Sequence, residues 1–562
     1  MATVISDNIT SPLGLTTEQT YKAVRQGKSG LTHYPCENGE GGWNDLPFPI
    51  EASLFNKEQW DKILVDGFSK FESLVLHSVK AAISTLNLNK EHAILILSST
   101  KGDIELLEKG EDMSSLADAA KKVSMAIGIE NDPIVVCNAC ISGVSAIILG
   151  QRLVDCGICS NVIVCGADVQ SRFIVSGFQA LKALSEEPCK PFDIERLGLN
   201  LGEAAATIVL SSEMNSPKGW KIDKGAICND AYHISAPHPK GLGAGMALRK
   251  MKDADNPIFV IGVHGTATMY NDQMESKAIE MAELQDVPLS ALKGYFGHTM
   301  GAAGVLETII TMRALEDGLI LPSKGFETRG VSGKVKMSDK PMMANGNTFV
   351  KMLSGFGGCN GAVRVSDRSL PQIIVNDILV SQTHSVRITL DEIVVDGSRL
   401  DVKSHAKEML TEVYKAKIGD YPKFYKMDML SRLAFVASEL LIGCDEENDD
   451  HSNDRAVVLF NHSSSIIADR QYVKSIEIDD FFPSPAAFVY TLPNITTGEI
   501  ALRNGYHGET SFYLLAERNE KLMQRVIKST FIDRDIKSVI GGWIDCPSEN
   551  KFECDIRIYV KE

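Results

Sequence analysis

Runs of apolar and β-branched residues alternate along the first part of the chain with stretches of helical periodicity. Such runs occupy residues 92–99, 132–137, 161–168 and 205–213. Each is short and mostly apolar, which is typical of strands that are buried on both faces of a sheet. A second set of alternating strands and helices begins at residues 257–263. The pattern predicts an α/β fold with buried strands.

The C-terminal part of the chain weakly repeats the N-terminal part. Four segments can be paired in the same order: 70–84 with 426–440, 92–104 with 455–467, 135–147 with 490–502, and 161–169 with 538–546. The shared order predicts that 371–562 is a degenerate second copy of the N-terminal half. In this alignment Ile495 stands where the first copy has Cys140, so the second copy lacks that cysteine.

Length and composition describe a large globular protein. The 562 residues exceed what one hydrophobic core usually organises, and 44% of them are hydrophobic. A net charge of −16 argues against nucleic acid or an anionic membrane as a partner. We find neither a signal-peptide pattern nor an apolar run of about 18 residues, so we expect a cytoplasmic protein. The 12 cysteines are dispersed, which favours reduced thiols.

One of these cysteines, Cys140, lies between a predicted strand and a predicted helix. The strand covers 132–137, and the small and apolar residues of 141–155 suit a buried helix. A thiol at a helix N-terminus meets unpaired N–H groups and the helix dipole, which lower its pKa and favour the thiolate. Cys140 is therefore a candidate nucleophile, and a buried inert cysteine is the alternative.

A zinc site competes for the same cysteine. Cys137 and Cys140 form one Cys-x-x-Cys pair and Cys156 and Cys159 form another, with residues 141–155 between them. This is the spacing of a four-cysteine zinc site. A continuous helix over 141–155 would nevertheless hold the two pairs roughly 20 Å apart, too far to share one ion. We therefore predict no metal site.

Two histidines stand in segments of small residues. His264 follows an apolar run, where α/β folds present catalytic groups, and His298 lies between glycines in the segment 292–304. Either one alone could be a hydrogen-bonded structural residue. The glycine-rich turn at 351–363 lacks the Lys-Ser or Lys-Thr of a phosphate loop, which favours an oxyanion or gating role.

Together these segments resemble the β-ketoacyl-acyl-carrier-protein synthases of the thiolase superfamily, specifically the elongating Cys-His-His type. The resemblance covers nearly all of residues 1–370. It rests on the following segments, in the family's order: 11–30, NACISG (138–143), 176–185, 191–206, HGTATMYND (264–272), 292–304 and GFGGCN (355–360). It implies an α/β thiolase-like fold of duplicated βαβαβαββ halves, layered α-β-α-β-α, with a C-terminal α/β domain that is like half a thiolase.

On this basis we expect three units. Residues 1–213 would form the first thiolase-like half, with the nucleophile, and 214–370 the second half, with both histidines. Residues 371–562 would form a domain that is like half a synthase and lacks the nucleophilic cysteine, and we expect it to pack against the synthase or another protein and to shape or cover the pocket.

The family's catalytic roles carry over to the matching residues. Cys140 would take an acyl group from a carrier-protein thioester, with its own N–H and that of Phe356 as the oxyanion hole. The Nε atoms of His264 and His298 would stabilise the enolate oxygen that develops as malonyl-carrier protein loses CO₂. The resulting carbanion would attack the acyl-cysteine. The reaction requires no cofactor.

Supporting roles carry over in the same way. Lys293 and Glu307 match the family's buried ion pair beside the histidines, Phe356 matches its gating phenylalanine, and Thr266 and Thr268 match the threonines that bind the pantetheine arm. A purely structural ion pair is the alternative for the first two.

Three departures from the family pattern concern fine detail, and one of them is GEAAA at 202–206, where the family has GEGA. Cys359 replaces the usual threonine of the glycine-rich turn, and Ile141 follows the nucleophile where a smaller residue is common. A branched side chain at 141 could narrow the acyl pocket, so acyl chain length stays open.

Other activities fit less well. A thiolase would need a second cysteine in place of His298, an initiating Cys-His-Asn synthase fails at the same position, and a cysteine hydrolase leaves the second histidine unexplained. We expect condensation in fatty acid or polyketide synthesis, aryl-polyene-like products included. The alternative is a subunit of a synthase pair in which 371–562 serves as a chain-length or partner-binding module.

The resemblance also implies partners. These are the acyl- and malonyl-loaded acyl carrier protein, bound through phosphopantetheine, and a second synthase in a homodimer or heterodimer. Carrier proteins are acidic, so Arg249, Lys250 and Lys252 are candidates for a basic docking patch, with ordinary solvated charge as the alternative.

Overall fold

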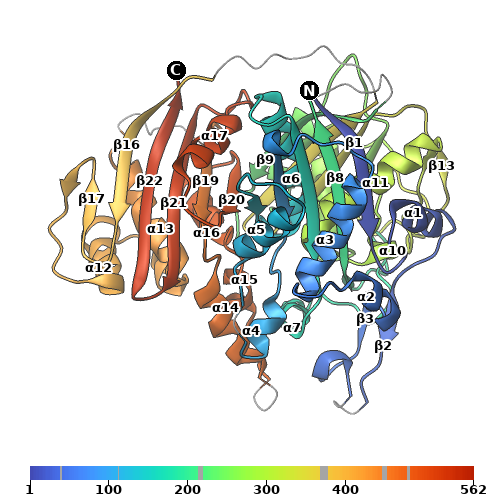
Figure 1. Cartoon of the computed structure of the whole chain (residues 1–562), viewed down its shortest axis with the longest axis horizontal. Coiled ribbons are helices and arrows are strands. Elements are labelled where there is room, and N and C mark those ends of the chain that lie inside the picture. The colour runs from blue at the N-terminus through green and yellow to red at the C-terminus, as the bar shows by residue number, and fades with distance from the viewer. Residues whose placement is uncertain (38–40, 112, 213–218, 368–377, 446–451, 478–480) are drawn as a thin grey trace.

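The computed structural model describes residues 1–562 except 38–40, 112, 213–218, 368–377, 446–451 and 478–480. Three groups of five strands make up most of its sheet structure, and helices cover them (Figure 1). The boundaries that we expect after residues 213 and 370 fall outside the described residues.

The first group of strands comes from the N-terminal part of the chain. β1 (Ala2–Thr10) pairs antiparallel with β8 (Ala204–Ser211), and β8 pairs antiparallel with β6 (Asn161–Asp168). β6 is parallel to β4 (Ala93–Ser98), which is parallel to β5 (Ile134–Val136). The last four strands are buried throughout, as their apolar runs predict.

The second group repeats this arrangement. In the same order and with the same directions it contains β9 (Lys221–Asn229), β15 (Cys359–Ser366), β14 (Phe349–Ser354), β10 (Val260–Gly262) and β11 (Leu289–Ser290). The duplication confirms the predicted pair of halves.

Helices form the remaining layers of the synthase part. α6 (Ser142–Asp155) and α11 (Ala303–Glu316) pack against each other and lie between the two groups of strands. α3 (Lys70–Ile83) covers the outer face of the first group, and α8 (Leu242–Lys250) covers that of the second, with α9 (Met269–Met281) beside it. This is the α-β-α-β-α layering that the resemblance implies.

The third group lies in the C-terminal part of the chain and follows the same plan. Its strands, in sheet order, are β16 (Val380–Ile388), β22 (Lys551–Lys561), β21 (Ser538–Ser548), β19 (Arg455–Asn461) and β20 (Thr510–Leu514). The first two pairings are antiparallel and the last two parallel, as in the first group. The C-terminal region is therefore half a thiolase-like fold.

A matching pair of carboxylates, one buried and one half-buried, supports this correspondence. Asp168, at the end of β6, accepts hydrogen bonds from the backbone N–H and the hydroxyl of Thr100 after β4. Asp545 in β21 accepts the same two bonds from Ser463 after β19. The two aspartates are paired in the sequence alignment, so their segments are matched correctly.

The third pair of matched segments is wrong. α16 (Ile495–Asn504) precedes β20, whereas α6 follows β5. The helix that follows β20 is α17 (Glu520–Thr530). Counting from the strands places Arg518, and not Ile495, at the position of Cys140. Small and apolar residues in both α6 and α16 caused the false match.

A reciprocal strand pairing joins the C-terminal unit to the synthase. β20 lies antiparallel to β5, with Tyr513 opposite Val136 and Leu514 opposite Val135. β5 and β20 each stand last in the strand order of their group and run antiparallel to each other, so a local two-fold rotation relates them. The otherwise open edge of β5 is covered, which removes a site of uncontrolled strand pairing.

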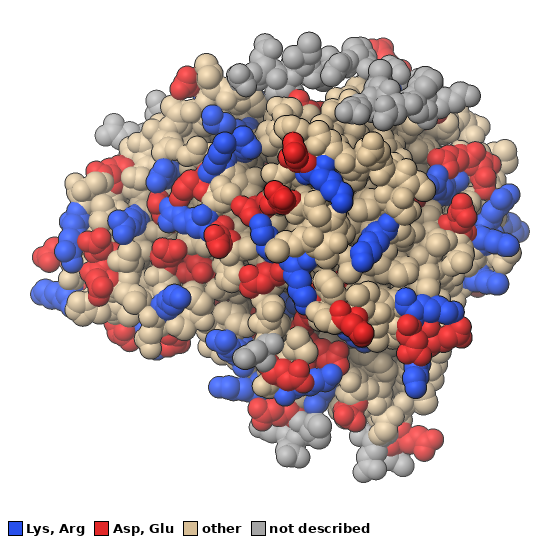
Figure 2. Space-filling view, viewed as in Figure 1, with Lys and Arg blue, Asp and Glu red and all other residues tan. Residues whose placement is uncertain are grey.

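The surface carries both charge signs, and Figure 2 shows Lys and Arg interspersed with Asp and Glu on one face. The three expected docking cations are already engaged: Arg249 donates to the Met281 carbonyl, Lys250 contacts Asp533, and Lys252 pairs with Glu283. Within the described ranges, no helix is both long and apolar enough to cross a membrane.

Candidate active site

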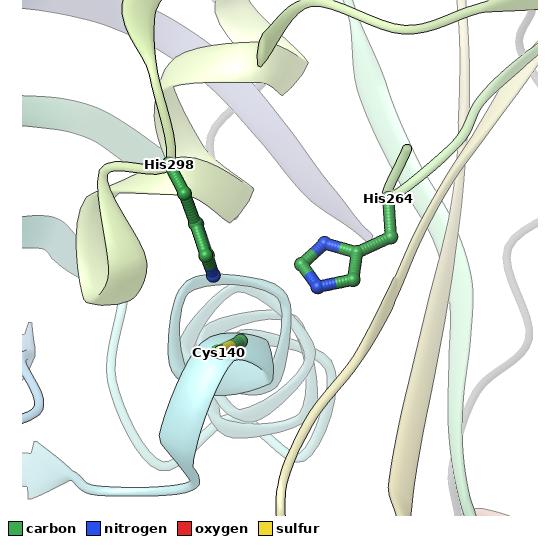
Figure 3. A group of neighbouring side chains, drawn as sticks. All are labelled: Cys140, His264 and His298. Atoms are coloured by element: carbon green, nitrogen blue, oxygen red, sulfur yellow. The ribbon is translucent and has the colours of Figure 1, made fainter. Parts of the chain in front are cut away.

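Cys140 lies in the single turn η3 (Ala139–Ile141), which connects the end of β5 to the start of α6. Ala139 adopts a left-handed backbone conformation with φ of 48°. A non-glycine residue in this region carries local strain, which is concentrated at functional sites in proteins. Figure 3 shows the Cys140 side chain facing the imidazoles of His264 and His298.

These three side chains form a compact buried cluster. The thiol sulfur and one nitrogen of each imidazole all lie within 4.8 Å of one another. The two rings are 5.1 Å apart and nearly perpendicular. One thiol and two imidazoles are also zinc ligands, so this cluster is where a metal could bind. Cys156 and Cys159 lie at the far end of α6 and outside the cluster.

Burial affects the pKa of the Cys140 thiol more strongly than does the position of the thiol before the helix. It raises the pKa of Cys140 to about 12, against a smaller lowering by Lys293. The expected thiolate-favouring shift is therefore wrong. A nucleophile of this kind must lose its proton during the reaction, and the neighbouring imidazole of His264 is the available acceptor.

His298 is held in one tautomer by the chain that follows it. The backbone N–H of Met300 donates to its Nδ1 at 3.2 Å, so the neutral ring carries its hydrogen on Nε2. Nε2 is buried and has no hydrogen-bond partner in the described part of the chain. An unpaired buried donor that faces Cys140 is suited to bind a substrate oxygen.

His264 follows β10, and a carboxylate fixes its backbone. Glu275 in α9 accepts the backbone N–H groups of His264 and Gly265 at 2.6 and 2.7 Å. The His264 Nδ1 is buried and has no partner among the described residues. Sequence reasoning missed Glu275. The segment HGTATMYNDQMES contained it, and its buried side chain was the missing information.

Two lysines share one carboxylate beside the histidines. Lys293 Nζ lies 2.8 Å from one oxygen of Glu307, and Lys351 contacts the other oxygen and the Val263 carbonyl. All three charged groups are buried. The predicted Lys293–Glu307 pair is present. Lys351, the first residue of the segment 351–363, is an addition that sequence reasoning missed.

This charge cluster keeps both imidazoles neutral. Burial, followed by the charges of Lys293, His298 and Lys351, holds the pKa of His264 well below its ordinary value. The pKa of His298 is lowered by burial, Lys293 and Lys351. Neutral His264 can accept a thiol proton, whereas neutral His298 presents its Nε2–H as a donor.

The glycine-rich turn between β14 and β15 approaches the nucleophile. A Cβ atom at Gly355 would lie 3.3 Å from the Cys140 backbone nitrogen, so the turn passes directly beside it. Phe356 follows, and its carbonyl accepts a hydrogen bond from Asn494 of the C-terminal unit at 2.8 Å. Asn494 was not predicted, because a contact between distant segments leaves no local pattern.

Two cavities meet at Cys140. The outer one, of about 470 Å³, includes Thr266 and Thr268, whose hydroxyls are 2.9 Å apart. The inner one is about 20 Å³. Cys140, Phe178 and Phe356 line both, so the two phenylalanines separate the cavities.

Ile141 and Cys359, two of the departures from the family pattern, have different surroundings in the structure. Ile141 is fully buried in the hydrophobic core and lines neither cavity, so it does not narrow the acyl pocket. Cys359 lies under the turn, with its thiol against the Phe356 carbonyl at 3.3 Å and near the Asn494 amide at 3.7 Å.

Comparison with known proteins gives matches over this part of the chain. The family model for the β-ketoacyl synthase N-terminal domain matches residues 78–215, and that for the C-terminal domain matches 221–327. The 3-oxoacyl-[acyl-carrier-protein] synthase 2 of Vibrio cholerae is 28% identical, over 63% of this chain and 95% of its own length. Nodulation protein E of a Rhizobium species is 30% identical over 37% of this chain and 54% of its own.

Solved structures extend the similarity in fold. The ketosynthase ApeO of Xenorhabdus doucetiae, solved in complex with its chain length factor ApeC, is 24% identical and covers 65% of this chain and 98% of its own, with a TM-score of 0.55. The keto synthase-chain length factor of PfaC is 14% identical, covers all of this chain and 78% of its own, and has a TM-score of 0.73. Residues 78–215 and 221–327 therefore match the two domains of the β-ketoacyl synthases, 63% of the chain is similar to a 3-oxoacyl-[acyl-carrier-protein] synthase, and the fold is that of the solved ketosynthases.

Proposed function

We propose that Cys140 carries the growing acyl chain and that His264 and His298 assist the decarboxylation of malonyl-carrier protein. The observation that carries this proposal is the unpaired, buried Nε2 of His298, which lies with His264 beside the thiol. The product is a β-ketoacyl chain for fatty acid or polyketide synthesis.

In the first half-reaction, the Cys140 sulfur attacks the thioester carbonyl of the acyl-carrier protein. A neutral imidazole accepts the thiol proton and passes it to the departing pantetheine sulfur. The backbone N–H groups of Cys140 and Phe356 stabilise the tetrahedral oxyanion. The close approach of the turn to the Cys140 nitrogen supports this pairing.

In the second half-reaction, malonyl-carrier protein occupies the outer cavity. The electrons of the breaking C–C bond form an enolate as CO₂ leaves, and the imidazole N–H groups of His264 and His298 bind its oxygen. The enolate carbon attacks the acyl-cysteine, and the C–S bond breaks to release the Cys140 thiolate, which takes up a proton from solvent. The Lys293–Glu307–Lys351 cluster keeps the imidazoles in position and neutral.

Carrier protein would deliver both groups through the outer cavity. Thr266 and Thr268 line it and are suited to hydrogen-bond a pantetheine arm. Its rim exposes three apolar side chains, Leu197, Met269 and Tyr270, which offer a contact surface for the carrier. A second synthase, as homodimer or heterodimer partner, would bind elsewhere than at the β5 edge, since β20 covers it.

We propose that the units 1–213 and 214–370 form the synthase and that 371–562 acts as its built-in chain-length module. Phe488 and Leu492 of this unit line the inner cavity beside Cys140, and Asn494 binds the carbonyl of the gating Phe356. A chain that ends at Ser366 should lose stability or change product length. If it is monodisperse and unchanged in rate and product length, the module has no such role.

The proposed roles are tested by measuring the two half-reactions separately. His298→Ala and His264→Ala should lower CO₂ release from malonyl-carrier protein by about 10²–10³-fold, as loss of one oxyanion donor does. Thr268→Ser serves as a conservative control in the same cavity. CO₂ release that survives both histidine substitutions would refute the assignment.

A further inference from the structure

The inner cavity behind Cys140 ends at a buried ion pair. Its walls include apolar side chains such as Ile174, Met300, Phe488 and Leu492, and also Lys101. At about 20 Å³ it has room for about one water molecule, so a longer acyl chain must displace a wall.

Lys101 binds across the boundary between the synthase and the C-terminal unit. Its Nζ lies 2.5 Å from Asp469 Oδ1 and also contacts the Thr491 carbonyl. The Lys101 and Asp469 side chains are each 4% exposed. Burial raises the pKa of Asp469 even beside the lysine, so the pair is tightly enclosed.

A third cavity, which we call the polar cavity, lies on the other side of this pair. It measures about 390 Å³ and is lined by polar side chains, including His462, Ser463 and Ser464. Thr100 and Lys101 line both the polar cavity and the inner cavity. The Lys101–Asp469 pair, with Thr100, is therefore the partition between them.

The walls of the inner cavity resist an acyl chain unequally. Phe488 and Leu492 are apolar and can change rotamer with their surface still in apolar contact. Displacement of Lys101 would separate a buried ammonium from the one carboxylate that it contacts among the described residues, which is strongly unfavourable. An alkyl chain would pass the apolar side chains more readily than the pair.

On the basis of the proposed function, we infer that the Lys101–Asp469 ion pair is the stop that limits acyl chain length. The acyl chain on Cys140 extends toward this ion pair. Removal of the pair joins the inner cavity to the polar cavity. Specificity would then reside in a contact between the two units and not in either alone.

The test uses the full chain and a series of unbranched saturated acyl-carrier proteins with malonyl-carrier protein. In the double variant Lys101→Ala/Asp469→Ala, the longest product found by mass spectrometry should shift by at least one condensation round. The Thr491 carbonyl keeps a hydrogen bond from Ser465, so this variant leaves no unpaired partner there.

A matched control comes from the same boundary. Arg152 and Glu509 form a second buried ion pair between the units and line neither cavity. Arg152→Met/Glu509→Gln should leave product length unchanged. An equal shift in both double variants would assign the effect to a loosened boundary and overturn the inference.

Failures of the two proposals are distinguishable. If the unaltered protein forms no acyl-Cys140 with any chain, the proposed function fails. If it does, and Lys101→Ala/Asp469→Ala keeps the original length limit, only the chain-length stop fails. If that variant does not fold, a structure of the unaltered acyl-enzyme with the longest accepted chain decides. The terminal methyl group should touch Lys101, and a chain that stops short of it contradicts the inference.

Discussion

Single residues next to the histidines set the pH at which the site can work. The positive charge of Lys351 contributes to the low pKa of both imidazoles. Lys351→Met should raise both pKa values, so His264 becomes protonated at higher pH and no longer accepts the thiol proton. The acidic limb of the pH profile for Cys140 acylation should therefore move to higher pH.

Lys351→Arg is the control for this shift because it keeps the charge. It should retain the acidic limb of the original protein even if its rate falls. An acidic limb that stays in place in Lys351→Met would show that Lys351 has a structural role only.

At this scale, motifs predicted which residues meet, and burial decided how they behave. Cys140, His264, His298, Lys293 and Glu307 come together as expected. The thiol pKa was predicted in the wrong direction, since depth in the fold is a property of the whole structure. The role of Lys351 in this charge cluster was not predicted, because the sequence does not distinguish a buried lysine in a strand from an ordinary surface lysine.

Between elements, one close contact borders the inner cavity. α7 (Arg172–Ala180) packs on α15 (Pro485–Tyr490) through Gly177, where a Cβ atom would lie 2.2 Å from the Phe488 ring. Gly177→Ala should force the ring to move and lower the free energy of unfolding by about 1–3 kcal/mol. Urea denaturation measures this change.

The double variant Gly177→Ala/Phe488→Leu makes room for the added methyl group. It should be more stable than the sum of the two single substitutions predicts. Simple additivity of the three free energies would contradict the contact.

Element prediction succeeded where the pattern was local. The buried strands and the order of repeated segments were readable, and three of the four matched pairs follow the strand order of the fold. The remaining pair, 135–147 with 490–502, was matched wrongly because α16 and α6 share small and apolar residues. Only strand pairing shows which helix follows which strand. Arg518 at the position of Cys140 pairs with Glu520 and Asp555.

At the scale of the whole molecule, we expect the synthase part and the C-terminal unit to fold as one cooperative unit. They share the β5–β20 pairing and the bidentate Arg152–Glu509 contact, whose side chains are 2% and 0% exposed. Glu509→Ala would leave the Arg152 charge buried without its carboxylate. It should destabilise the protein by about 3–5 kcal/mol and still unfold in a single calorimetric transition.

Arg152→Met/Glu509→Gln provides the comparison, since it removes both charges together. Its stability should lie closer to that of the original protein. Separate transitions for two parts of the chain would contradict a shared folding unit.

The overall plan was partly predictable. Internal repetition indicated a third half-unit without the cysteine, and the strand order confirms a half thiolase-like fold. The register that joins β20 to β5 could not be predicted, because a pairing between residues so far apart leaves no local periodicity.

The central claim is that Cys140 carries the acyl chain. Its most direct test is mass spectrometry of the protein after incubation with a panel of acyl-carrier proteins. The account predicts a mass increase equal to the acyl group on the peptide that contains Cys140, and none in Cys140→Ala. Acyl loading that persists in Cys140→Ala would contradict it.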